Sequence, residues 1–150
     1  MPIKMVVSGG VVSADKVVTT PLIEIPGIVT AILYTTGDAM GTKFEVLVPP
    51  AGEIRTLVFI DKDDEGVAMT LLLFDSDFTG IADNTAMNLS DADLEKVIGA
   101  VALGTASYAN LVSNQMGQIL NVGISYVAPE GKLWGQWVVN GGPTIAAGAI

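Results

Sequence analysis

The chain has 150 residues, with 16 acidic and 7 basic side chains, a net charge of -9, and neither cysteine nor histidine. This length suits one ordinary domain, and the negative charge repels a phosphate backbone, so nucleic acid is not an expected partner. The missing residue types exclude disulfides, thiolate metal sites and histidine-assisted nucleophilic catalysis. Hydrophobic residues make up 50% of the chain and charged residues 15%, which indicates that part of the apolar surface is an interface.

Short bursts of valine, isoleucine, leucine and threonine, punctuated by glycine and proline, predict many strands and little helix. The expected strands cover residues 4–7, 11–19, 28–34, 43–48, 54–60, 67–74, 98–103, 118–127 and 132–139. Eight or nine strands without crossover helices favour an all-β, two-sheet, jelly-roll-like β-sandwich over a parallel α/β fold. Because no internal repeat or linker interrupts this pattern, residues 1–150 are expected to form a single domain.

Both ends of the chain are apolar and almost free of charge. Residues 1–12 and 142–150 are rich in valine, isoleucine and alanine. A disordered tail would be polar enough to stay solvated, so we expect apolar terminal arms that order against a neighbouring subunit. The first residues have too short an apolar stretch for a secretory signal, and no apolar run is long enough for a membrane span.

Three segments between the expected strands predict turns. Residues 49–52 (PPAG) cannot continue a strand ladder, because proline has no N–H to donate. Residues 61–66 (DKDDEG) are polar throughout and read as a solvated hairpin loop. Residues 129–131 (PEG) form the third turn.

One short helix, at about residues 91–98, has start and stop signals. Ser90 is expected to accept a hydrogen bond from the backbone near Asp93 as the N-cap, and Gly99 to end the helix as a C-cap. Acidic side chains favour the positive end of the helix dipole: Asp91, Asp93 and Glu95. Three apolar residues share one face: Leu94, Val97 and Ile98. This face should pack on a sheet, so that the helix plugs the open end of the sandwich.

Two acidic segments are similar to the opening of a calcium-binding loop. Residues 61–66 alternate Asp61, Asp63 and Glu65 before a glycine, but the twelfth position, which should be a bidentate glutamate, is Leu72. Residues 75–80 begin a similar spacing, and its twelfth position is an alanine. A solvated acidic turn explains both segments, so no metal site is assigned, and structural calcium is the alternative.

Two patterns raise the question of catalysis. Asp83 and Asn84 could pair with Asp75 or Asp77 for glycoside hydrolysis, but aspartate and asparagine favour turns, and nothing orients or tunes these groups. Residues 37–43 (GDAMGTK) lack the glycine spacing of a phosphate loop. We therefore assign no catalytic, cofactor-binding or metal-ligating residue, and the chain is not expected to be an enzyme.

Aromatic residues suggest an alternative function. Trp134 and Trp137, with Tyr126 and Tyr108, could form a sugar-stacking platform of a carbohydrate-binding sandwich on a virion or cell surface. A spacing of three on a strand, however, points the two tryptophans to opposite faces. One is therefore expected in the core and the other at the surface or in an interface.

Three segments carry a family resemblance. In residues 71–101 (LLLFDSDFTGIADNTAMNLSDADLEKVIGAV), an apolar strand runs into an Asp-Asn turn, a Ser-Asp-Ala-Asp helix start and an Ile-Gly close. In residues 33–44 (LYTTGDAMGTKF), a Tyr, a Gly-Asp pair and a Gly lead the chain into the sandwich. Residues 133–144 (LWGQWVVNGGPT) supply a closing strand. Together these segments resemble the capsid decoration proteins, also called cement or head-stabilisation proteins, of tailed bacteriophages.

The resemblance implies a structural virion protein without catalytic activity or cofactor. Such a protein is made in the host cytoplasm, binds the outer surface of the capsid and stabilises it by bridging major capsid protein subunits. The resemblance further implies homotrimers at or near the threefold axes of the lattice. The charge of -9 suits an external position better than one beside packed DNA.

Overall fold

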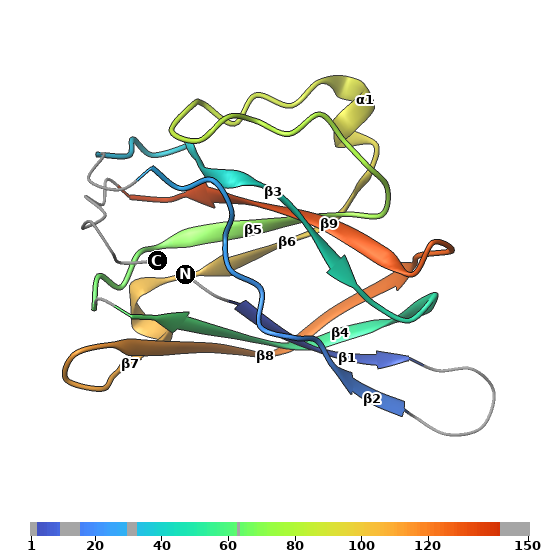
Figure 1. Cartoon of the computed structure of the whole chain (residues 1–150), viewed down its shortest axis with the longest axis horizontal. Coiled ribbons are helices and arrows are strands. Elements are labelled where there is room, and N and C mark those ends of the chain that lie inside the picture. The colour runs from blue at the N-terminus through green and yellow to red at the C-terminus, as the bar shows by residue number, and fades with distance from the viewer. Residues whose placement is uncertain (1–2, 10–15, 30–32, 63, 142–150) are drawn as a thin grey trace.

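The structure is a computed structural model that describes residues 3–9, 16–29, 33–62 and 64–141. In these residues, two antiparallel sheets pack face to face (Figure 1). The predicted all-β sandwich with one short helix is therefore confirmed.

The first sheet has five strands. Its order is β2 (Lys16–Thr19), β1 (Ile3–Gly9), β4 (Ala51–Asp61), β8 (Gln115–Val127) and β7 (Tyr108–Asn110). The second sheet has four strands, in the order β3 (Ala39–Leu47), β9 (Lys132–Val139), β5 (Met69–Phe74) and β6 (Val97–Leu103). The consecutive strands β3 and β4 lie in different sheets, as do β8 and β9. Strand β3 pairs antiparallel with β9, and β4 pairs antiparallel with β8. This ribbon-on-ribbon pairing across both sheets is the jelly-roll-like feature of the fold.

The core between the sheets follows the strand alternation of the sequence. On β4, Ile54, Leu57 and Phe59 are fully buried. The Trp137 ring on β9 meets the Phe59 ring edge-on, with 5.2 Å between ring centroids. Each such side chain contributes about 1.5–3 kcal/mol by leaving water, so the packed core is a main source of the stability of the sandwich.

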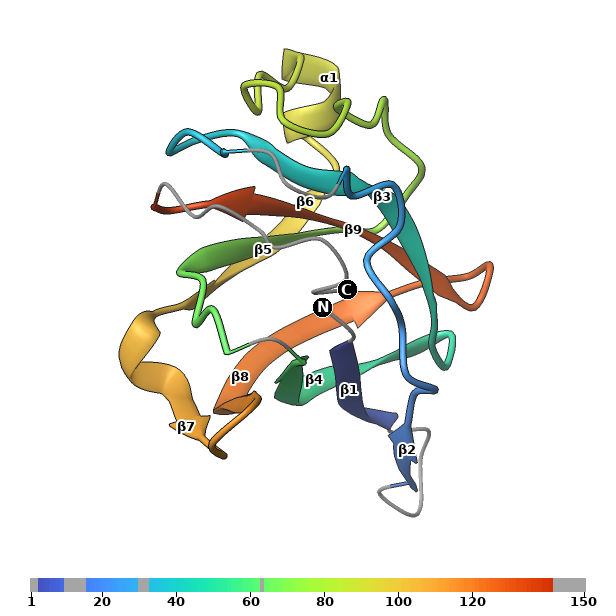
Figure 2. The same cartoon turned by 60° about the vertical axis from the view of Figure 1, so that its left-hand side comes forward.

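A second, smaller apolar cluster lies on the outer face of the four-stranded sheet. Residues 75–96 fold back over this face and include the short helix α1 (Asp91–Leu94) (Figures 1 and 2). Beneath them, the Phe74 and Phe78 rings stack at 3.7 Å, and Trp134 packs in the same cluster. Trp134 and Trp137 thus point to opposite faces as predicted, but both are buried.

The strand predicted at residues 4–7 is confirmed, but within this chain it is not a terminal arm that extends toward a neighbour. Residues 3–9 form β1, which pairs with β2 on one side and β4 on the other. Ile3 and Met5 are fully buried in the main core. Residues 1–2, 10–12 and 142–150 of the two predicted arms lie outside the described residues.

The helix starts as predicted and ends earlier. The Asp93 N–H donates to Ser90 Oγ at 3.2 Å, which confirms the N-cap. Val97 and Gly99, however, already belong to β6, because pairing with β5 prevails over the weak helical pattern. Leu94 is 53% exposed, and α1 lies on the outer side of the four-stranded sheet instead of at the open end of the sandwich (Figure 2).

Two other predictions need correction. The segment at residues 28–34 is not a strand in its described parts, residues 28–29 and 33–34, while residues 30–32 lie outside the description. The loop at residues 61–66 joins β4 to β5 in the other sheet, so it is a connection between sheets and not a hairpin. Sequence analysis missed β7 and the 3-10 helix η1 (Thr105–Ser107), both of which are very short.

Candidate interaction surfaces

Two of the acidic residues considered as ligands or catalysts hold turns in place. Asp61 accepts hydrogen bonds from the Glu65 and Gly66 N–H groups at 2.9 and 2.8 Å, which closes its loop. Asp83 accepts from the Gly41 N–H at 2.6 Å and from the Tyr34 hydroxyl at 2.8 Å, which fastens its turn to β3. Among the described residues, which do not include Asp63, no group of three or more acidic side chains could hold a metal ion.

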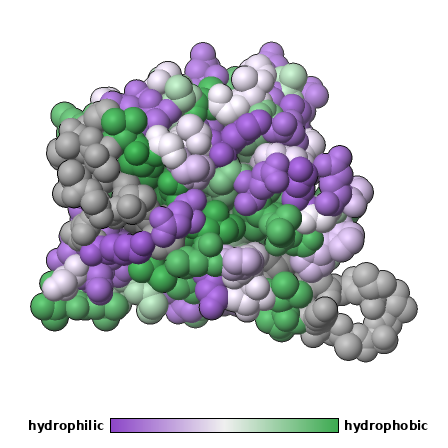
Figure 3. Space-filling model, in the orientation of Figure 1, coloured by the Kyte–Doolittle hydropathy of each residue, from purple (hydrophilic) through white to green (hydrophobic). Residues whose placement is uncertain are grey.

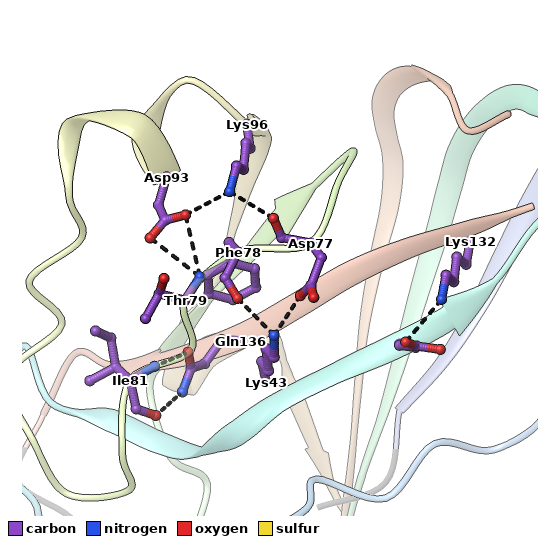
Figure 4. A network of polar contacts seen from close by, with 10 residues as sticks. Lys43, Asp77, Phe78, Thr79, Ile81, Asp93, Lys96, Lys132 and Gln136 are labelled. Carbon is purple, nitrogen blue, oxygen red and sulfur yellow. Dashed lines mark hydrogen bonds and ion pairs between the residues drawn. The ribbon is translucent and has the colours of Figure 1, made fainter. Parts of the chain in front are cut away.

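A polar network fixes residues 75–96 on the sheet (Figure 4). Lys43 donates to Asp77 and to the Phe78 carbonyl, the latter at 2.7 Å. Lys96 donates to Asp93 at 2.9 Å, and this hydrogen bond holds the pKa of the Asp93 carboxyl below its usual range. The hydrogen bond from Lys43 likewise lowers the pKa of Asp77. The network therefore depends on ionised carboxylates.

The four aromatic residues do not form a common platform. The side chains of Trp134, Trp137 and Tyr126 are at most 5% exposed, and burial raises the pKa of Tyr126 to about 12. Tyr108 donates its hydroxyl to the Val67 carbonyl at 2.8 Å. Three of the rings are buried and Tyr108 is partly buried, so the four present no common stacking surface to a sugar.

The outer face of the five-stranded sheet is different, because no described segment crosses it (Figures 1 and 2). We call it the open sheet face, formed by the outward side chains Lys4, Thr56, Val58, Ile60, Met116, Gln118 and Leu120. Neighbours in register include Ile60 with Met116 and Thr56 with Leu120. Met116 is 40% and Leu120 59% exposed. A solvent-facing antiparallel sheet normally alternates apolar inward and polar outward positions, so this face suits a partner surface.

Charge is distributed unevenly between the two outer faces. The segment over the four-stranded sheet carries the acidic side chains Asp75, Asp77, Asp83, Asp91, Asp93 and Glu95. On the outer face of the five-stranded sheet, Lys4 is charged, and the partly exposed side chains of Glu53 and Arg55 on β4 lie 3.7 Å apart as an ion pair. The molecule thus has an acidic side and a nearly neutral, apolar side.

One long stretch of the chain is also without charge, and sequence analysis missed it. No charged residue occurs in residues 97–129, which form β6, η1, β7 and β8. The sequence feature that could have revealed this stretch was the long interval without a charged residue, and no motif marks it. At the turn from β7 to β8, Leu111 is 55% and Val112 89% exposed. This turn projects at the lower left of Figure 1, where Figure 3 shows apolar surface.

Comparison with family profiles, curated proteins and solved structures finds no match to this chain. No helix among the described residues is long and apolar enough to cross a membrane. The function is therefore inferred from the surfaces of the protein.

Proposed function

We propose that the protein is a structural virion component that binds the outer surface of a phage capsid and stabilises it by bridging major capsid protein subunits. The open sheet face is the observation that carries this proposal. It would lie against the capsid, while the acidic segment over the other sheet would face the solvent. The resemblance of residues 71–101 to tailed-phage decoration proteins supports the same assignment and adds a homotrimeric arrangement.

The mechanism is association and involves no bond chemistry. Outward side chains such as Val58, Ile60 and Leu120 lose contact with water when they are covered, at about 25 cal/mol per Å² of apolar surface. Where one subunit spans two capsid proteins, these contacts must break before the two capsid proteins can separate. The second candidate, a carbohydrate-binding module, is not favoured, because the rings considered for it are packed inside the protein.

The first test is the composition of the particle. Virions assembled from the genome that encodes this chain should contain it in an amount comparable to the major capsid protein, as measured by quantitative mass spectrometry. Its absence from purified virions would refute the proposal.

The second test locates the contact by adding purified variants to heads that lack the protein. Leu120→Lys places a charge on the open sheet face, and Leu94→Lys places the same charge at a similarly exposed leucine on the opposite side of the molecule. We expect Leu120→Lys to be lost from sedimented heads and Leu94→Lys to be retained. Equal retention of both variants would show that the open sheet face is not the contact.

A further inference from the structure

Asn140 differs from every other asparagine of the chain in the residue that follows it. It precedes Gly141, whereas the others precede residues that carry a side chain. Asparagine is thermolabile, because the backbone nitrogen of the next residue can attack its side-chain Cγ. A glycine at that next position puts no Cβ in the way and restricts the backbone least. The other asparagines are Asn84, Asn88, Asn110, Asn114 and Asn121.

The structure leaves the attacking nitrogen of this pair accessible. Asn140 and Gly141 form a bend directly after β9, and Asn140 is exposed. In the part of the chain that the structure describes, the Gly141 N–H has no hydrogen-bond acceptor, and a Cβ built at Gly141 would meet nothing within 4 Å. The Gly141 nitrogen is therefore neither engaged in a sheet nor screened by another segment.

Two hydrogen bonds hold Asn140 at the end of β9 without covering its carboxamide carbon. The Asn140 N–H donates to the Ala68 carbonyl at 2.9 Å, and its Nδ2 donates to Thr70 Oγ1 at 2.7 Å. Neither contact involves Cγ, and because the residue is exposed, water has access to its side chain. Both reactants that hydrolysis of the side-chain amide needs, the Gly141 nitrogen and water, can therefore reach it.

We propose that Asn140 is a site of spontaneous deamidation. The Gly141 nitrogen loses its proton to the solvent and forms a bond to Asn140 Cγ, while the bond from Cγ to Nδ2 breaks and Nδ2 takes up a proton and leaves as ammonia. Water then opens the resulting five-membered succinimide at one of its two carbonyl carbons. Opening at one carbonyl gives aspartate, and opening at the other gives isoaspartate.

Either product changes the end of β9. A carboxylate cannot donate to Thr70 as Nδ2 does, and it adds a negative charge to a chain whose net charge is already -9. Isoaspartate also inserts one methylene into the main chain ahead of residues 142–150. Copies of one chain would thus come to differ in charge and in backbone length at this junction. The inference does not depend on capsid binding.

The test is peptide mapping by mass spectrometry of the folded, full-length protein during incubation at neutral and at mildly alkaline pH. The peptide that contains residue 140 should gain the mass difference between a hydroxyl and an amino group, while peptides with the other asparagines react far more slowly. The rate should rise with pH, because the attacking nitrogen must lose its proton. On isoelectric focusing, the new acidic species should migrate with the Asn140→Asp variant.

Gly141→Ala is the variant that isolates the chemistry. Gly141 does not have a positive φ, and nothing lies near its Cβ position, so alanine should leave the melting temperature unchanged. It should slow deamidation by about tenfold or more, because a Cβ restricts the backbone and crowds the approach to Cγ.

Incubation in urea separates the effect of the fold from that of the local sequence. If Asn140 reacts in the unfolded chain but not in the folded protein, the fold protects it and the inference is overturned. Equal rates for the parent and Gly141→Ala, or equal rates at all the asparagines, would overturn it as well. If the protein deamidates at Asn140 but does not bind heads, the proposed function fails and this inference stands.

Discussion

Gln136 joins three separate parts of the chain through one fully buried amide. Its Nε2 donates to the Gly41 carbonyl at 3.0 Å and to the Ile81 carbonyl at 2.6 Å, while its Oε1 accepts from the Ile81 N–H at 3.0 Å. Gln136→Leu leaves these backbone groups unpaired, so we expect a loss of about 2–4 kcal/mol in the free energy of unfolding, measured by urea denaturation. Gln118→Leu, on the open sheet face, should change it little, and equal losses would contradict this account.

Asp93 makes the stability of the folded protein depend on pH in the acidic range. Because the hydrogen bond from Lys96 lowers its folded-state pKa, its contribution is present above the ordinary aspartate pKa of about 3.9 and is lost as the pH falls through the folded value. Asp93→Asn should therefore melt below the parent at neutral pH, and the gap should narrow below about pH 4. Calorimetry across this range measures the gap. Asp75→Asn, in the same segment, should melt like the parent, and a pH-independent gap for Asp93→Asn would contradict the argument.

At the scale of elements, β6 approaches β8 closely because Gly99 has no side chain. A Cβ at Gly99 would lie 2.5 Å from Ile124 Cδ1, which is too close without a shift. Gly99→Ala should lower the melting temperature, and Ile124→Val, which removes that Cδ1, should recover part of the loss in the double variant. Gly104→Ala is the matched control, since nothing lies near the corresponding Cβ. Additive effects of the two substitutions would show that the contact is not limiting.

Sequence alternation was sufficient to predict most strands of the sandwich, including β9 with its observed bounds. It failed where tertiary pairing decided the outcome. The strand at residues 4–7 was predicted, but it was assigned to a terminal arm, because its partners on β2 and β4 are brought beside it only by folding. The cap of the helix was predictable because Ser90 and Asp93 are local, whereas its end was not, because the partner of β6 is distant in sequence.

The candidate surfaces were harder to predict than the strands. A single outward residue such as Leu120 is ordinary on any protein surface, and only the register of β4 with β8 shows that it continues an apolar face. The sequence did predict that an acidic, apolar chain uses part of its surface as an interface. It placed that interface in the terminal arms, whereas the described residues offer the open sheet face and the uncharged residues 97–129.

At the scale of the whole molecule, the absence of histidine and cysteine removes the side chains that ordinarily titrate near neutrality. Retention on heads and self-association of the free protein should therefore be the same at about pH 6 and about pH 8. Quantifying bound protein after sedimentation at the two values measures the first, and light scattering the second. Release of the protein over this interval would mean that a carboxylate with a strongly raised pKa controls the contact.

The net charge also fixes how self-association should respond to salt. Copies that carry -9 repel each other at long range, while a contact made through apolar side chains adds no ion pair. Salt shortens the Debye length from about 10 Å at 0.1 M to about 3 Å at 1 M, so it screens the repulsion and leaves the apolar contact intact. The dissociation constant of the free protein, from sedimentation equilibrium, should therefore fall as sodium chloride is raised. An interface built on ion pairs would respond in the opposite direction, so weakening by salt would place the contact on the charged surfaces of the molecule.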